Sequence, residues 1–109
     1  CAGGPVCDWK YYEAMYGERY MDTPEENPEG YQNSSLLSKA NCLNRRLLVI
    51  HCTTDPVVVW QNSIDFVQKC IEKGILLDYF IYPGHDHNVA GKDRAHLIKK
   101  IEDYFERNL

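Results

Sequence analysis

The chain has 109 residues, of which 44% are hydrophobic, and a formal net charge of -4 at pH 7. This length suits one small domain over residues 1–109, and the composition is that of a globular protein, which excludes a disordered chain. The negative charge gives no electrostatic reason to expect nucleic acid as a partner, and no apolar run is long enough to cross a membrane.

The cysteines are odd in number and form no paired spacing: Cys1, Cys7, Cys42, Cys52 and Cys70. An odd count argues against a closed disulfide framework. Because free cysteine packs as a small hydrophobic residue, we expect mostly buried free thiols.

The first predicted element is a short helix over residues 9–16, capped by Asp8 and ended by Gly17. Three aromatic residues fall on one face of this helix: Trp9, Tyr12 and Tyr16. Taken alone, such a stripe indicates core packing.

An acidic connector over residues 21–32 follows. Within it, Thr23-Pro24-Glu25-Glu26 forms a capping box with proline at the first helical position, which predicts one helical turn. Residues 33–35 offer a second cap, so we expect a short helix over residues 36–40.

The central element is the apolar run over residues 47–50, which small polar residues and Asp55 follow at once. A run of this length bounded by turn residues predicts a strand buried on both faces. A helix then starts near Trp60 and ends at Gly74, with a predicted apolar stripe. That stripe consists of Ile64, Val67 and Ile71, with Cys70 beside them.

A second strand is predicted over residues 78–82, followed by a polar loop and a last helix with Asp93 as its cap. The apolar face of this last helix consists of Leu97, Ile98, Ile101, Tyr104 and Phe105. The order strand, helix, strand, helix predicts an α/β fold with parallel strands and flanking helices. Two or three parallel strands bury both faces poorly, so we expect an incomplete sheet and a chain that begins within a larger protein.

Asp55 follows the first of these strands and His87 follows the second. Active sites gather at the carboxyl edge of parallel sheets, and an acid and a base in this order form the Asp…His half of a hydrolase triad. The alternative is that Asp55 is a turn or cap residue and that His87 is a solvated loop residue. No G-x-S-x-G motif is present, and none of the serines sits on a strand-to-helix elbow: Ser34, Ser35, Ser38 and Ser63.

A second alternative is a metal site, because His85 and His87 have an H-x-H spacing with His51 or Cys52 nearby. This spacing is weakly specific. We expect His51 to be a satisfied structural histidine and His96, on the last helix, to be exposed.

The whole chain resembles one protein family. The stretches that carry the resemblance are 2–9, 11–12, 15–21, 27–31, 48–61 and 82–89, among which Y-G-E-R-Y-M and H-D-H-N-V are distinctive. They resemble the dipeptidyl peptidase IV and prolyl tripeptidyl peptidase branch of the prolyl oligopeptidase group of serine peptidases. The resemblance implies the C-terminal part of an α/β-hydrolase catalytic domain.

The resemblance also implies roles for particular residues. Asp55 matches the triad acid and His87, rather than His85, matches the triad base. The positions that match the family's proline pocket are Val6, Trp9, Tyr12, Tyr16 and Val58. Two positions depart from the pattern, since Cys52 replaces a glycine and Val57 stands where mammalian relatives place an asparagine.

The function implied is that of a serine exopeptidase that releases N-terminal X-Pro dipeptides, or X-X-Pro tripeptides, without a cofactor or metal. The partners implied are proline-containing peptides and the rest of a parent chain, which carries the nucleophile, the oxyanion tyrosine and a β-propeller. We therefore expect this chain alone to be inactive, and its open sheet edges make self-association a further expectation. The parent protein is expected to be periplasmic, cell-surface or secreted. The alternative function is a non-catalytic binding domain with the same fold.

Overall fold

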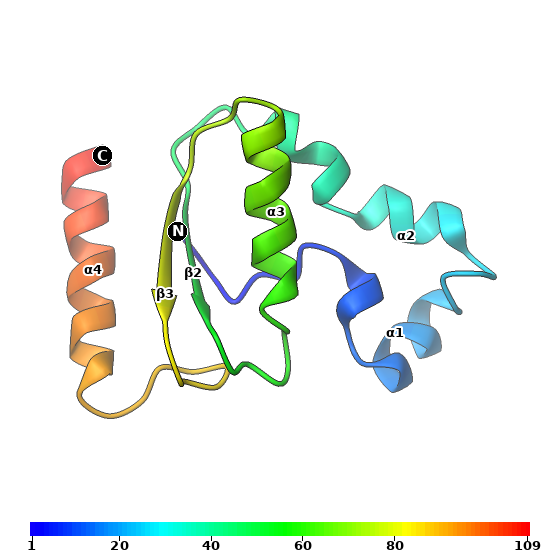
Figure 1. Cartoon of the computed structure of the whole chain (residues 1–109), viewed down its shortest axis with the longest axis horizontal. Helices are drawn as coiled ribbons and strands as arrows, with labels where there is room; N and C mark the ends of the chain where they lie inside the picture. Colours follow the sequence, from blue (N-terminus) through cyan, green and yellow to red (C-terminus); the bar gives the residue numbers. More distant parts are fainter.

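The computed structural model describes all 109 residues. Its elements, in chain order, are β1 (Ala2–Gly3), the 3-10 helix η1 (Trp9–Tyr11), α1 (Ala14–Met21), α2 (Pro28–Ser34), the 3-10 helix η2 (Leu37–Cys42), β2 (Leu48–Cys52), α3 (Gln61–Glu72), β3 (Asp78–Tyr82) and α4 (Asp93–Asn108). Figure 1 shows the strands and the helices α3 and α4 as one body. The segment that contains η1, α1 and α2 projects from this body and is called the arm below. No helix combines the length and the apolar character that spanning a bilayer requires.

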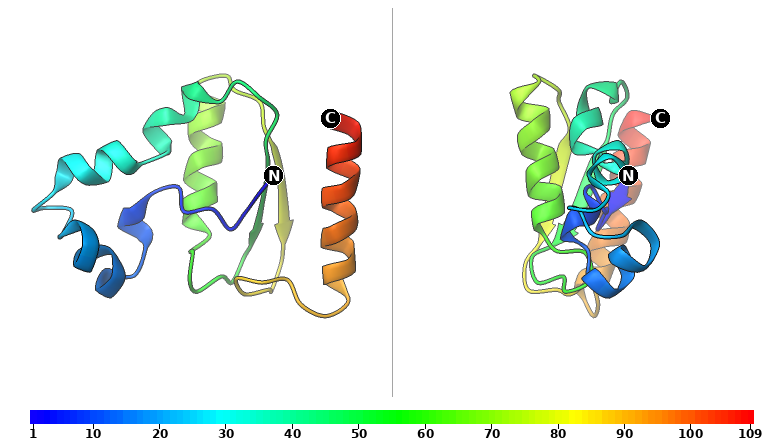
Figure 2. Two further views of the ribbon diagram at one scale, coloured as in Figure 1. Left: turned by 180° about the vertical axis from the view of Figure 1, so that it is seen from behind. Right: turned by 90° about the vertical axis from the view of Figure 1, so that its right-hand side faces the viewer.

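The sheet has three parallel strands in the order β1-β2-β3, which confirms the α/β prediction. β2 lies in the middle and pairs with β3 from Leu48↔Asp78 to Cys52↔Tyr82. All five residues of β2 are buried, as expected for a strand covered on both faces. Helices α3 and α4 lie on opposite sides of the sheet (Figure 2). Both β2 and β3 end at the lower edge of Figure 1, so the loops that follow them meet there.

Each face of the sheet has its own apolar cluster. On the α4 side, Leu48, Ile50 and Cys52 of β2 pack with Tyr82 and Tyr104. The α3 side contains a second cluster, formed by Cys7, Ala40, Phe66 and Cys70. Successive side chains of a strand point to opposite faces, which explains why Leu48, Ile50 and Cys52 all lie on the α4 side, while Leu47, just before β2, packs against the second cluster.

Several predicted boundaries on the arm are wrong. The helix expected over residues 9–16 is interrupted, because Tyr12 and Glu13 are extended and separate η1 from α1. Gly17 does not end a helix but lies buried inside α1, where a Cβ would sit 3.5 Å from the hydroxyl of Tyr31. This is an ordinary contact distance, so Gly17 lies against Tyr31 of α2 without a close approach that requires glycine.

The acidic connector contains more helix than the sequence predicted. The capping box is confirmed, since Thr23 N donates to Glu26 Oε2 at 3.2 Å and Glu26 N donates to Thr23 Oγ1 at 3.1 Å. The helix α2 that follows was missed, although Asn27 caps it through a bond from Gly30 N and Pro28 begins it. Its sequence lacks an apolar stripe, which is the signal that periodicity depends on.

Two further predictions need correction. Ile64 and Ile71 of α3 are exposed, and the buried residues of this helix are Asn62, Ser63, Phe66 and Cys70. The buried face was missed because two of its four members are polar. On α4, Lys92 occupies the cap position and Asp93 lies in the first turn instead.

Candidate active site

Asp55 lies on the loop that leaves the carboxyl end of β2, and only 5% of its surface is exposed. Its Oδ1 accepts hydrogen bonds from the backbone N–H groups of Val57 and Val58, both at 2.9 Å. The turn role that the sequence offered as an alternative is therefore present. It leaves the second carboxylate oxygen, Oδ2, free to bind another group.

That other group is His87, on the loop after β3. The distance from His87 Nδ1 to Asp55 Oδ2 is 2.8 Å, and 40% of the histidine side chain remains exposed while the carboxylate is covered. Burial alone would raise the pKa of Asp55, but the bonds from His87, Val58 and Val57 outweigh it and hold the pKa below its ordinary value. An ionised carboxylate can only accept a hydrogen bond, so Nδ1 carries the proton and Nε2 presents a lone pair.

His51 lies on the other side of the same carboxylate. Its Nε2 is 2.7 Å from the carbonyl oxygen of Val58 and 3.5 Å from Asp55 Oδ2. Because a carbonyl only accepts, Nε2 donates, and the buried Nδ1 is left with no partner. The expectation of a structural histidine is therefore met at one ring nitrogen and not at the other.

Gly4 is a site residue that the sequence did not single out. Its φ is +51°, and a Cβ at this position would lie 3.1 Å from Cε1 of the His87 ring and 3.5 Å from Asp55 Oδ2. A side chain here would press on the imidazole and would also strain the backbone. The Gly3-Gly4-Pro5 run after β1 was the available signal, but only the fold shows what packs against it.

The aromatic residues of the arm form a cluster. The ring of Trp9 lies 5.2 Å from Tyr12 and 6.0 Å from Tyr16, with an interplanar angle of 17° to the latter. Tyr20 extends the cluster, at 5.1 Å from Tyr16, and the sequence prediction missed it. Tyr16 is 46% exposed, so the cluster presents an open aromatic surface rather than a filled core.

The other two pocket candidates lie in different places. Val6 is half-buried in the segment before η1. Val58 is buried in the Asp55 loop, where its N–H binds Asp55 and its carbonyl accepts from His51. The structure thus joins Val58 directly to the acid, on the chain that leads into α3.

A buried side chain of α3 holds the segment that carries Trp9. Asn62 Oδ1 accepts from the backbone N–H groups of Cys7 at 3.0 Å and Asp8 at 3.1 Å. Asp8 in turn caps η1 through Lys10 N and accepts from the hydroxyl of Ser35. Asn62 was missed as a functional candidate because a lone asparagine inside a helix carries no pattern.

No group of three His, Cys, Asp or Glu side chains in the chain is arranged to hold a metal ion. His85 and His87 face different carboxylates, since His85 Nε2 lies 2.7 Å from Asp93 Oδ2. The five cysteines are free, and three of them are buried. Burial, with smaller contributions from Cys70 and Asp8, raises the pKa of the Cys7 thiol to about 12.

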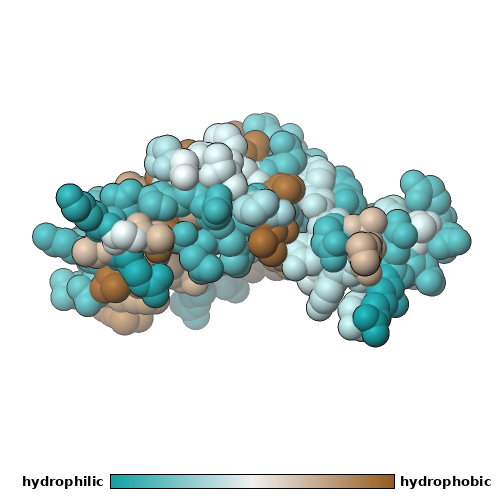
Figure 3. All heavy atoms as spheres, turned by 90° about the horizontal axis from the view of Figure 1, so that it is seen from below, coloured by the Kyte–Doolittle hydropathy of each residue, from teal (hydrophilic) through white to brown (hydrophobic).

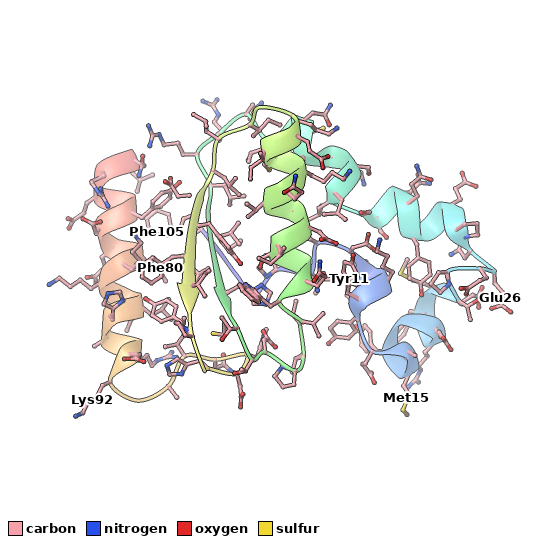
Figure 4. All side chains as sticks on the ribbon, viewed as in Figure 1. Tyr11, Met15, Glu26, Phe80, Lys92 and Phe105 are labelled. Carbon is pink, nitrogen blue, oxygen red and sulfur yellow. The ribbon has the colours of Figure 1, made fainter.

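The surface at this end of the molecule is open to solvent. Figure 3 views this end and shows a mostly hydrophilic surface with small, separate hydrophobic groups. In Figure 4, Lys92 marks the start of α4 at this end, and Met15 lies at the far side, on the arm. An acid–base pair and an aromatic surface therefore occupy one end of the molecule, on two different parts of the chain.

Proteins of known sequence and structure are similar to this chain. Probable dipeptidyl-aminopeptidase B of Aspergillus oryzae is 44% identical over 94 residues, which is 81% of this chain and 10% of that protein. The protein of the same name from Talaromyces marneffei is 42% identical over 91 residues, with the same shares. This chain therefore spans about a tenth of the length of these relatives.

Two solved structures superpose on nearly the whole chain. A Bacteroides ovatus protein assigned as a dipeptidyl aminopeptidase IV gives a TM-score of 0.95 at 55% identity, over 98% of this chain and 15% of its own. Porphyromonas gingivalis dipeptidyl peptidase 4 gives 0.93 at 36% identity, over 99% of this chain and 16% of its own. The family model described as the prolyl oligopeptidase family matches residues 1–109. The chain therefore belongs to the prolyl oligopeptidase family.

Proposed function

We propose that this chain supplies the acid and the base of a serine exopeptidase that removes N-terminal X-Pro dipeptides from peptides. The observation that carries the proposal is the 2.8 Å bond between His87 Nδ1 and the covered Asp55 carboxylate, with the other side of the ring open. The names of the relatives, which are dipeptidyl aminopeptidases, support the reaction class.

In the proposed reaction, His87 Nε2 takes the proton of a serine hydroxyl while the serine oxygen attacks the carbonyl carbon of the proline residue. Asp55 keeps the proton of the resting imidazole on Nδ1 and stabilises the imidazolium that forms. His87 then returns the proton to the leaving amine, and a water molecule hydrolyses the acyl-enzyme by the same route.

The nucleophile comes from another part of the proposed enzyme. Each serine hydroxyl of this chain has a partner elsewhere: Ser34 donates to Tyr31 O, Ser35 to Asp8, Ser38 to Ser35 O and Ser63 to Trp60 O. None of these partners is His87. We therefore also propose that the 109 residues alone do not hydrolyse X-Pro substrates.

The open aromatic cluster supports proline as the residue before the scissile bond. Flat, rigid rings offer a large apolar area at a low entropy cost, and a pyrrolidine ring is compact and apolar. Trp9, Tyr12 and Tyr16 are the residues that we propose contact it, with Val6 and Val58 at its margin.

The test uses the full-length parent protein with Gly-Pro-p-nitroanilide and Ala-Ala-Pro-p-nitroanilide. We expect His87→Ala to lower kcat by about 10⁴–10⁶-fold, because the loss of a triad base removes most of the chemical rate enhancement. His96→Ala is the matched control, since His96 is an exposed histidine of α4 that hydrogen-bonds to Tyr82 and stacks on Phe80, and this variant should keep its activity.

The ratio of the two substrates distinguishes removal of dipeptides from removal of tripeptides. Full activity in His87→Ala would contradict the triad. A parent protein that cleaves neither substrate would instead support the alternative of a non-catalytic binding domain with this fold.

A further inference from the structure

Two threonines join the loop that carries Asp55 to the loop that carries His87. Thr53 N donates to Tyr82 O at 3.2 Å, and Thr54 N donates to His85 O at 3.3 Å. Two side-chain bonds reinforce these, because Gly84 N donates to Thr53 Oγ1 at 2.9 Å and Thr54 Oγ1 donates to His85 O at 2.8 Å. We propose that Thr53 and Thr54 are positioning residues that set the separation of Asp55 and His87, an inference that rests on the proposed function.

The hydroxyl groups of Thr53 and Thr54 make two hydrogen bonds that residues without a hydroxyl would not make. The backbone bonds of Thr53 and Thr54 lie just beyond the pairing of β2 with β3, which ends at Cys52↔Tyr82, and they do not depend on the threonine side chains. The hydroxyl of Thr53 pairs the N–H of Gly84, which sits in a left-handed turn with φ of +75°. The hydroxyl of Thr54 gives the carbonyl of His85 a second donor, so this carbonyl is bound twice by one residue.

These bonds lie very close to the reacting groups along the chain. Asp55 directly follows Thr54, and His87 is two residues beyond His85. A change at the threonines is therefore transmitted to both catalytic side chains through only one or two residues. A misplacement of about 1 Å between reacting groups costs about 10²-fold in rate, so a small shift of one loop is sufficient to lower kcat.

The far side of the His87 loop is anchored independently. The side chain of His85 binds Asp93 in the first turn of α4 at 2.7 Å, and the N–H of Ala90 lies 3.5 Å from His85 Nδ1. His85 is thus held by Asp93 through its ring and by Thr54 through its carbonyl. Loss of the threonine hydroxyls leaves only the two backbone bonds between this loop and the Asp55 loop, while the attachment to α4 remains, so the loop is expected to shift rather than unfold.

The experiment compares variants of the intact parent protein. Valine keeps the shape and the β-branch of threonine but lacks the hydroxyl, so Thr53→Val, Thr54→Val and their double variant remove only the side-chain bonds. Thr53→Ser restores the hydroxyl of Thr53. Thr23→Val is the matched control, because the Thr23 hydroxyl accepts a similar bond from Glu26 N at 3.1 Å on the arm.

We expect the double variant to lower kcat about 10- to 100-fold with KM changed less than about 2-fold, since the threonines are not among the proposed pocket residues. Thr53→Ser should stay within about 2-fold of the wild-type kcat, and Thr23→Val should match the wild type. Unchanged kcat in the double variant, or an equal loss in Thr53→Ser and Thr53→Val, would overturn the proposal.

A second measurement does not depend on catalysis. Amide hydrogen exchange in the peptide over residues 82–88 should become faster in Thr53→Val, because Gly84 N–H loses its acceptor, and should return to the wild-type rate in Thr53→Ser. Unchanged exchange in Thr53→Val would also overturn the proposal. If the parent cleaves neither proline substrate, the proposed function fails, and the exchange rates still decide whether the hydroxyls hold this loop.

Discussion

At the scale of single residues, Asp55 performs three tasks with one carboxylate: it closes the turn after β2, orients His87 and lies beside His51. Its pKa is held below the ordinary value of 3.8, so folding favours the ionised form. The resulting stabilisation is complete above that value and is lost as the pH falls through it toward the pKa of the folded protein. Acid should therefore weaken this corner of the molecule first.

We accordingly expect Asp55→Asn to lower the melting temperature of the intact protein at pH 7, with a difference from wild type that shrinks as the pH falls below about 4. Calorimetric scans between pH 3 and pH 7 measure this difference. Glu102→Gln, on the exposed face of α4, is the control and should follow the wild type throughout. A difference that is independent of pH would assign the effect to packing instead of to charge.

At the scale of elements, α3 is the support that connects the sheet to the arm. Its buried Asn62 binds two backbone N–H groups near Trp9, and its Asp65 accepts from the hydroxyl of Tyr11. Tyr11 lies against α3 in Figure 4. The position of the aromatic cluster therefore depends on one helix that contains none of its members.

Asn62→Ala would leave the N–H groups of Cys7 and Asp8 without their acceptor. We expect a loss of about 1–3 kcal/mol in stability and a larger rise in KM than fall in kcat for proline substrates, because the proposed pocket loosens while Asp55 and His87 stay in place. Urea unfolding and steady-state kinetics measure the two effects. Asn33→Ala, at an exposed position of α2, should change neither stability nor kinetics. A fall in kcat as large as the rise in KM would contradict the expectation that Asn62 supports the pocket and not the catalytic pair.

At the scale of the whole molecule, the sheet has an open side. β1 is short and pairs only with β2, so its other edge is unpaired. Elsewhere on the surface, large apolar side chains are exposed, among them Met15, Ile71 and Leu76, the last of which is 93% exposed. β3 is the other edge strand of the sheet, and Figure 4 shows Phe80 and Phe105 between β3 and α4. An unpaired strand edge is a template for pairing with another chain.

The isolated 109-residue chain should therefore self-associate through β1 as its concentration rises. Gly4 N donates to Ile50 O at 2.8 Å, and N–H groups alternate along a strand, so the N–H of Gly3 points to the open edge. Gly3→Pro removes this donor and should lower the apparent mass in light scattering toward that of a monomer. Gly3→Ala keeps the N–H, and its Cβ would meet no atom within 4 Å, so it should associate like the wild type. A monodisperse wild-type monomer would contradict the expectation.

Several elements could be predicted from the sequence because their signals are local. The apolar run of β2, the strand at residues 78–82, the stop at Gly74 and the capping box are encoded within a few residues, and the structure confirms each. The order of strand and helix predicted the parallel pairing, and this pairing predicted that Asp55 and His87 would meet at one edge. The resemblance to the prolyl oligopeptidase family came from motifs that are equally short.

The surroundings of Asp55 and His87 depend on contacts between distant parts of the chain, which the sequence did not predict. Gly4 lies against His87, Asn62 holds the segment before Trp9, and Thr53 binds Gly84, although the members of each pair are far apart in the sequence. Such contacts have no periodicity along the chain, so propensity and spacing do not predict them. For the same reason the exposed Ile64 and Ile71 were placed on the buried face of α3, because a stripe shows that a helix is amphipathic but not which neighbours cover it.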